Sequence, residues 1–175
     1  MSLRACGITV LLGASTASAE DVLAIRWEQS RVRPHDESLA AVIRAAAERS
    51  KTLRSLITKI DGTNGIVYIH PAKCPGHVKA CLFQHLQLAG PNRVLHIGVS
   101  VTRRGEVDVA SSIGHELQHA WEVLQRADVT SSREMLGVWT AGLKYSTEAY
   151  ETSEAIDVGT DVRRELSATD FSQSR

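Results

Sequence analysis

The sequence predicts an α+β fold in which helices gather around a small mixed sheet. In three stretches, 37–60, 109–126 and 148–166, apolar residues recur every three or four positions, which is the spacing of a helix that buries one face. Two runs, 66–70 and 93–101, are rich in β-branched residues and follow turn residues, as strands do. Helices and strands mixed in this way are typical of α+β folds, and 175 residues are enough for one domain with a substantial core.

Turn residues separate these elements along the chain. The first helix is broken near Ser50, and the turn over 61–65 lies between it and the first strand. A further strand is expected around 80–88, and the turn over 90–92 separates it from the next strand. Another turn, over 103–105, precedes the second helix.

The charge balance does not point to a polyanionic partner. Lys and Arg number 20, as do Asp and Glu, so the formal net charge is zero. Proteins that bind nucleic acid or an anionic membrane surface normally carry a basic patch or stripe, which this balance does not favour. Beyond the N-terminus, no stretch approaches the ~20 apolar residues that a membrane-spanning helix needs. We therefore expect no nucleic-acid partner and no membrane span.

The first nineteen residues predict a cleaved signal peptide. Arg4 supplies a positive charge, residues 8–12 are apolar, and residues 17–19 (Ala-Ser-Ala) fit the small-x-small site of a signal peptidase. The mature chain would then run from residue 20 to residue 175 as a single domain. We expect it to be exported, either to the periplasm or to the medium.

Cysteine usage agrees with export. Cys6 lies in the predicted signal peptide, which leaves Cys74 and Cys81 as an even pair in the mature chain. In an oxidising compartment such a pair is a candidate for a disulfide.

Residues 115–119 read His-Glu-Leu-Gln-His within the helix predicted over 109–126. On a helix, His115 and His119 are about 40° apart around the axis, so both imidazoles can reach one metal ion. Glu116 lies beside them at about 100°, while the apolar residues of the helix gather at about 140° to 240°. The helix can therefore pack on one side and present a metal site on the other.

This motif resembles that of the zincin metallopeptidases, and the stretch from about 108 to 166 resembles small bacterial gluzincin-like members. The resemblance implies that His115 and His119 bind Zn²⁺. It also implies that Glu116 is the catalytic base, acting on a zinc-bound water to hydrolyse a peptide or other amide bond. The metzincin subclass is excluded, because its motif continues with Gly and His where this chain has Glu122 and Gln125.

A catalytic zinc ion takes a third protein ligand and keeps one open position. In gluzincins this ligand is a glutamate of a later helix, and the helix predicted over 148–166 offers Glu148, Glu151 and Glu154. Glu151 shares the apolar stripe of that helix, where a carboxylate is costly without a strong partner, so it is the favoured ligand. Glu148 is the alternative, although an acid in the first turn of a helix needs no metal to explain it.

The groups that would orient the ligands are harder to assign. Larger gluzincins place an aspartate four residues after the ligand glutamate to orient a histidine, whereas this chain has Ala155 there. The orienting groups must therefore come from elsewhere. Glu122 shares the histidine face of its helix, where an ion pair with Arg126 is the simpler role.

Two other functions stay open. Peptide deformylases carry the same motif with an upstream cysteine as third ligand, and Cys81 would take that place in a deformylase-like amidase. A degenerate peptidase that binds zinc and serves as an interaction module, without turnover, would have the same ligands. The favoured hypothesis is an exported, monomeric zinc metallopeptidase that acts on a peptide or protein substrate.

Overall fold

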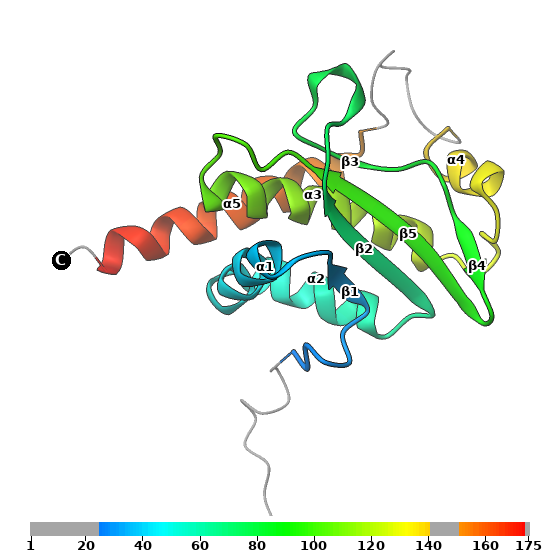
Figure 1. Cartoon of the computed structure of the whole chain (residues 1–175), viewed down its shortest axis with the longest axis horizontal. Helices are drawn as coiled ribbons and strands as arrows, with labels where there is room; N and C mark the ends of the chain where they lie inside the picture. The colour runs from blue at the N-terminus through cyan, green and yellow to red at the C-terminus, as the bar shows by residue number, and fades with distance from the viewer. Residues whose placement is uncertain (1–24, 141–150, 174–175) are drawn as a thin grey trace, which may run out of the picture.

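The computed structural model describes residues 25–140 and 151–173 (Figure 1). The predicted signal peptide, residues 1–19, and Glu148 lie outside the described residues. Helices and a mixed sheet make up the described part, so the predicted α+β class is confirmed. The elements are β1 (Val32–Pro34), α1 (Glu37–Arg49), α2 (Lys51–Asp61), β2 (Gly65–Pro71), the 3-10 turn η2 (Pro75–His77), β3 (Ala80–Leu82), β4 (Gln87–Ala89), β5 (Asn92–Val99), α3 (Glu106–Leu124), α4 (Ser132–Thr140) and α5 (Ser153–Gln173).

The strands form one mixed sheet in the order β1-β2-β5-β3, with β4 also pairing with β5 (Figure 1). β1 and β2 are parallel, as are β2 and β5, whereas β3 and β4 run antiparallel to β5. The strand predicted over 80–88 is thus two short strands, and β1 is too short to have been predicted from its pattern. β3 lies at the edge of the sheet, beside α3.

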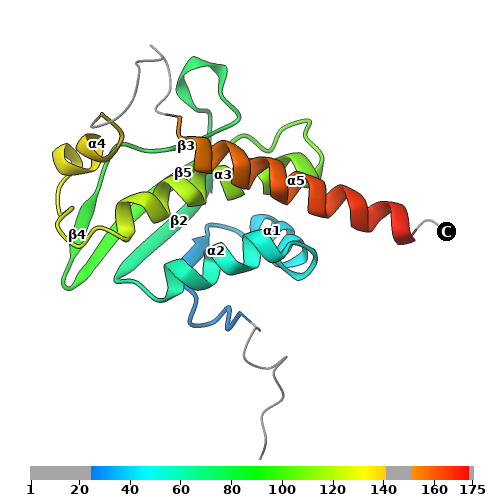
Figure 2. The same ribbon diagram turned by 180° about the vertical axis from the view of Figure 1, so that it is seen from behind.

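The sheet buries one face under the helices. Val67, Ile69, Leu95 and Ile97 alternate along β2 and β5 toward this face and are fully buried in the core. Helices α2, α3 and α5 lie on this side of the sheet, as the view from behind shows (Figure 2). The site helix α3 therefore rests on the sheet through its apolar side.

The predicted break at Ser50 is confirmed. Ser50 has an extended backbone, ends α1 and begins α2, and its hydroxyl caps α2 by accepting a hydrogen bond from the N–H of Leu53 at 3.1 Å. The same hydroxyl donates to the carboxylate of Glu165 on α5 at 2.6 Å, which ties the two helices together. None of the described helices is long and apolar enough to cross a membrane.

A buried arginine holds the C-terminal end of α3 against the sheet. Arg93 of β5 is only 4 % exposed, and its guanidinium donates to the carbonyls of Leu124 at 2.7 Å, Arg126 at 2.6 Å and Val129 at 3.1 Å. Its Nε also donates to the side-chain oxygen of Asn64 at 2.9 Å. Carbonyls at the end of a helix lack intrahelical partners, so a buried cation satisfies them and complements the helix dipole.

Two glycines allow α3 and α5 to pack closely. A Cβ added at Gly114 would lie 3.1 Å from a methyl carbon of Val162, and one added at Gly159 would lie 3.3 Å from Cβ of His115. Both distances are tighter than ordinary contacts between carbon atoms. This close approach brings the start of α5, and the residues just before it, next to the histidines of α3.

Candidate metal centre

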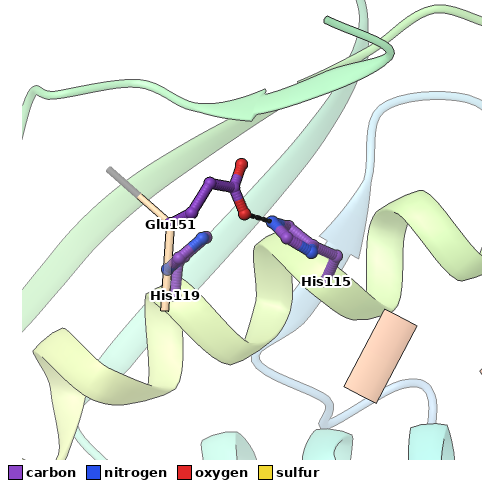
Figure 3. A group of neighbouring side chains, drawn as sticks. All are labelled: His115, His119 and Glu151. Atoms are coloured by element: carbon purple, nitrogen blue, oxygen red, sulfur yellow. Dashed lines mark ion pairs between the residues drawn. The ribbon is translucent and has the colours of Figure 1, made fainter. Parts of the chain in front are cut away.

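His115 and His119 stand one turn apart on α3, as their spacing predicts. Their rings are nearly perpendicular, with centroids 4.9 Å apart. Glu151 reaches over them from the segment before α5, and its Oε2 lies 3.0 Å from Nε2 of His115 (Figure 3). One ligand atom from each of the three side chains lies within 4.8 Å of the others, so the group could hold a metal ion.

Glu151 reaches this position for a different reason from the one that the sequence suggested. α5 begins at Ser153, after Thr152, whose hydroxyl caps the helix by accepting from the N–H of Ala155 at 3.2 Å. Glu151 therefore precedes the helix, and its side chain is 41 % exposed. The prediction that it lies on an apolar helical stripe is wrong, whereas its place beside the two histidines is as expected.

Glu122 supplies the orienting contact that the sequence left unassigned. Its Oε2 lies 3.1 Å from Nδ1 of His119, and its Oε1 accepts from the hydroxyl of Thr152 at 2.7 Å. The indole N–H of Trp139 donates to the same carboxylate at 3.3 Å. The predicted pair with Arg126 is wrong, because Arg126 instead contacts Asp128 at 3.1 Å.

The ring of His115 is held between two partners. Besides Glu151 on one side, it hydrogen-bonds the backbone of Ala155 in the first turn of α5. Burial works to lower the pKa of His115, but the hydrogen bond with Glu151 and the charges of Glu116 and Glu151 outweigh it, so this pKa is raised. The hydrogen bond from His115 correspondingly lowers the pKa of Glu151.

Glu116 is a buried carboxylate that faces the edge of the sheet. Only 8 % of the residue is exposed, and its Oε2 accepts a hydrogen bond from the backbone N–H of Leu82 in β3 at 2.7 Å. Burial raises the pKa of Glu116, against the charges of His119 and His115 and the hydrogen bond from Leu82, which lower it. A carboxylate with a raised pKa is suited to taking up and releasing protons nearer neutral pH.

Open space lies on both sides of this group of residues. One cavity of about 350 Å³ is lined by Leu82, Phe83 and Trp139 together with Glu116 and His119. A second, of about 430 Å³, is lined by residues of α3, α5 and the start of β3, including His115. Glu116 and Glu151 border both cavities, so the two form halves of one cleft that runs along β3.

Cys74 and Cys81 form the predicted disulfide, which is confirmed. It closes the loop that leads into β3, and Cys81 itself lines the cleft. Because its sulfur is bonded to Cys74, Cys81 is not a free thiolate, and the described group of metal-binding side chains does not include it. This arrangement disfavours a deformylase-like site.

Two histidines outside the motif, His70 and His96, lie away from the candidate centre. His96 alternates with the buried Leu95 and Ile97, so it lies on the face of the sheet away from α3. There its Nδ1 lies 2.9 Å from Nε2 of His70, and its ring stacks on Tyr68. These side chains form a separate group that does not reach the candidate centre.

Helix α4 and its Trp139 were missed in the sequence. Trp139 packs edge-on against His119, with ring centroids 5.9 Å apart. A local signal was present, because Ser131 and Glu134 form a capping box: the Ser131 hydroxyl accepts from the N–H of Glu134 at 3.3 Å, and the Glu134 carboxylate accepts from the N–H of Ser131 at 3.0 Å. That pattern marks Ser131 as the N-cap of a helix that begins at Ser132.

Comparison with protein-family models, with curated proteins and with solved structures gave no match to this chain. The donor set itself limits which metal ions would suit the site. Two imidazoles and one carboxylate suit divalent first-row transition metals better than Mg²⁺ or Ca²⁺, which prefer oxygen donors alone. Three protein donors also leave room in the coordination shell for a further ligand from solution.

Proposed function

We propose that the chain is an exported zinc metallopeptidase that hydrolyses peptide bonds. The observation that carries the proposal is the juxtaposition of His115, His119 and Glu151, whose ligand atoms lie within 4.8 Å of one another, with the buried carboxylate of Glu116 beside them. Two histidines and a glutamate are a known ligand set of catalytic zinc, and one coordination position then stays open. Bound there, zinc would lower the pKa of a water molecule toward 7 and polarise a carbonyl group.

Glu116 is proposed as the general base. It borders the cleft beside both histidines but is not one of the three clustered ligands. The N–H of Leu82 fixes one carboxylate oxygen at 2.7 Å, which orients the side chain toward the cleft between α3 and β3. Its raised pKa favours accepting a proton from water and passing it to the leaving amine.

The edge strand β3 supports an extended peptide as substrate. The residues on either side of β3 bond toward β5: the N–H of Phe83 donates to the carbonyl of His96, and the carbonyl of Lys79 accepts from the N–H of Ser100. In an antiparallel pair every second residue bonds to the neighbouring strand in this way. Ala80 and Leu82 therefore direct their backbone groups away from β5 and toward the cleft, where the N–H of Leu82 is already bonded to Glu116 and the carbonyl of Leu82 and the backbone of Ala80 face the open space. An extended peptide can add to such an edge through main-chain hydrogen bonds, which need no particular side chain.

The Cys74–Cys81 disulfide supports export. Disulfides persist mainly in oxidising compartments, and this pair agrees with the signal peptide proposed over residues 1–19. We propose that the mature enzyme begins at residue 20, forms a single domain, acts as a monomer and meets its peptide or protein substrates outside the cytoplasm. The N-terminal residue of the exported protein, measured by mass spectrometry, tests the cleavage site.

The decisive experiment combines zinc content with turnover. The purified mature protein should bind about one zinc per chain and cleave a broad peptide library only when zinc is present. Glu116→Gln should keep the zinc and lose about 100-fold or more of the activity, because it removes the base and not a ligand. His115→Ala and His119→Ala should lose the metal itself.

Two control variants test whether the losses are specific to the residues of the site. His96→Ala removes a histidine from the opposite face of the sheet, and Glu106→Gln removes an acid from the first turn of α3. Both should keep full zinc content and activity.

Two outcomes would contradict the proposal. Wild-type protein that binds zinc but cleaves no peptide would favour a zinc-binding module without turnover. An active Glu116→Gln variant would show that Glu116 is not the general base.

A further inference from the structure

The two halves of the cleft differ in chemistry, and we infer from them the class of peptide that the site cleaves. The geometry points to a substrate with an apolar side chain before the scissile bond and an acidic side chain, or a terminal carboxylate, after it. This inference rests on the proposed peptidase function.

One half of the cleft is apolar. This half is lined by Leu82 at the end of β3, by Phe83 just after it and by Trp139 of α4. Val78, in the loop before β3, borders both halves. The indole N–H of Trp139 is directed at Glu122, which leaves the carbons of the ring to form the wall. Apolar walls of this kind bind an aliphatic or aromatic side chain by removing its surface from water.

The other half is polar and carries cations. Lys79 precedes β3 and is exposed, Arg163 projects from α5, and Ser111 and Thr160 line the space between them. Arg163 is held in place, because its guanidinium contacts Asp108 and donates to the hydroxyl of Ser111 at 3.0 Å. A fixed guanidinium in a partly enclosed space is suited to binding a carboxylate.

Three cations gather around Asp108 at the margin of this half. Asp108 interacts with Arg163, through a hydrogen bond and through charge, and with the charges of Lys79 and Arg104, which together lower its pKa. One carboxylate thus faces three cations. Two other acids, Glu116 and Glu151, border this half on the side of the histidines, where Glu151 contacts His115 and Glu116 accepts from the N–H of Leu82. An acidic group of the substrate placed at the far side, next to Lys79 and Arg163, would be attracted by these two cations.

The direction of β3 determines which substrate side chain, the apolar or the acidic one, comes before the scissile bond. Lys79, just before the strand, lines only the cationic half, Ala80 borders both halves, and Leu82 at the end of the strand lines only the apolar half. Antiparallel pairing is the more stable way to add a strand. A peptide paired in this way has its N-terminal residues beside Leu82 and Phe83 and its C-terminal residues beside Lys79, so the apolar side chain precedes the cut and the acid follows it.

The test uses matched peptides that differ at one position. A peptide with Phe before the cut and Glu after it is compared with the same peptide carrying Gln or Lys after the cut. We expect kcat/KM for the Glu peptide to exceed that for the Gln peptide about two- to fivefold, with the Lys peptide poorest, and the ratio to fall as salt is added. Lys79→Glu should abolish or invert the preference, whereas Lys73→Glu, which changes an exposed lysine of the neighbouring loop, should leave it intact.

A binding measurement on an inactive variant separates recognition of the peptide from its cleavage. Zinc-loaded Glu116→Gln protein should bind the Glu peptide more tightly than the Gln peptide, as measured by calorimetry. Arg163→Lys should retain more of this difference than Arg163→Gln, because it keeps the charge beside Asp108. Equal cleavage and equal binding of the Glu and Gln peptides would overturn the inference while leaving the peptidase proposal standing. Failure to cleave any peptide would overturn the proposed function and the inference with it.

Discussion

The carboxylate of Glu122 lies 3.1 Å from Nδ1 of His119, one turn along the same helix. Hydrogen bonds from His119 and Thr152 outweigh the effect of burial and lower the pKa of Glu122, so it is an ionised acceptor and Nδ1 carries the proton. The Nε2 lone pair of His119 is then free to bind a metal ion. A carboxylate behind a ligand histidine in this way fixes its tautomer and raises its basicity.

Glu122→Ala is expected to weaken zinc affinity by about 10- to 100-fold without removing a ligand. Glu122→Gln should cost less, because its one amide oxygen can still accept from His119, although the second position, next to Thr152, then holds an amide nitrogen. Chelator competition at one pH measures both variants. Asp128→Ala, which removes an exposed acid beyond the end of α3, is the control and should leave zinc affinity unchanged. Unaltered affinity in Glu122→Ala would mean that His119 needs no such support.

Glu151→Ala is expected to lower zinc affinity by orders of magnitude, since it removes the proposed third ligand. Glu154→Ala should have almost no effect, because Glu154 is exposed and contacts its neighbour Ser153. Glu148→Ala belongs in the same series as the alternative ligand. If Glu148→Ala loses the metal while Glu151→Ala keeps it, the assignment moves to Glu148. If all three variants keep the metal, the third ligand is none of these glutamates.

The parts of the fold that could be predicted are those with a local pattern. β2 and β5 carry β-branched residues between turns, and α3 separates its apolar residues from His115 and His119. The break at Ser50 was also visible, because a serine there can cap the next helix. In each of these segments the pattern extends over enough residues to indicate both the type of element and the face that it buries.

The parts that could not be predicted depend on contacts between distant segments. Glu122 meets Trp139 and Thr152, which are 17 and 30 residues away in the chain. The sequence predicts Glu151 on a helical stripe, but the cap at Thr152 starts α5 later, and the packing of α5 on α3 sets the position of Glu151. The spacing of residues within one helix carries no information about such contacts.

Arg93→Met is expected to lower the free energy of unfolding by about 3 kcal/mol or more, because it leaves carbonyls at the end of α3 buried without a donor. Urea denaturation of the metal-free protein measures the change. Arg44→Met is the matched control: Arg44 pairs with Glu37 on the exposed side of α1, so its loss should change stability by about 0.5 kcal/mol or less. Equal effects of the two substitutions would show that the contacts of Arg93 contribute little to stability.

Gly159→Val is expected to impair both stability and metal binding. A Cβ at this position would lie 3.3 Å from Cβ of His115 and 3.4 Å from the carbonyl oxygen of Ser111, and the methyl groups of valine would reach further. α5 must then move away from α3, at a cost of about 1–3 kcal/mol for overpacking. Because Glu151 lies two residues before the start of α5 and His115 lies at the point of contact, we expect zinc affinity to fall at least tenfold.

Gly137→Val in α4 makes the same substitution where space is free, since a Cβ there meets nothing within 4 Å. It should leave zinc affinity unchanged and alter stability by about 0.5 kcal/mol or less, because valine and glycine differ little in helix propensity. Thermal unfolding and chelator competition on both variants separate the two effects. Destabilisation of Gly159→Val with zinc affinity intact would mean that the distance between α3 and α5 does not set the position of Glu151.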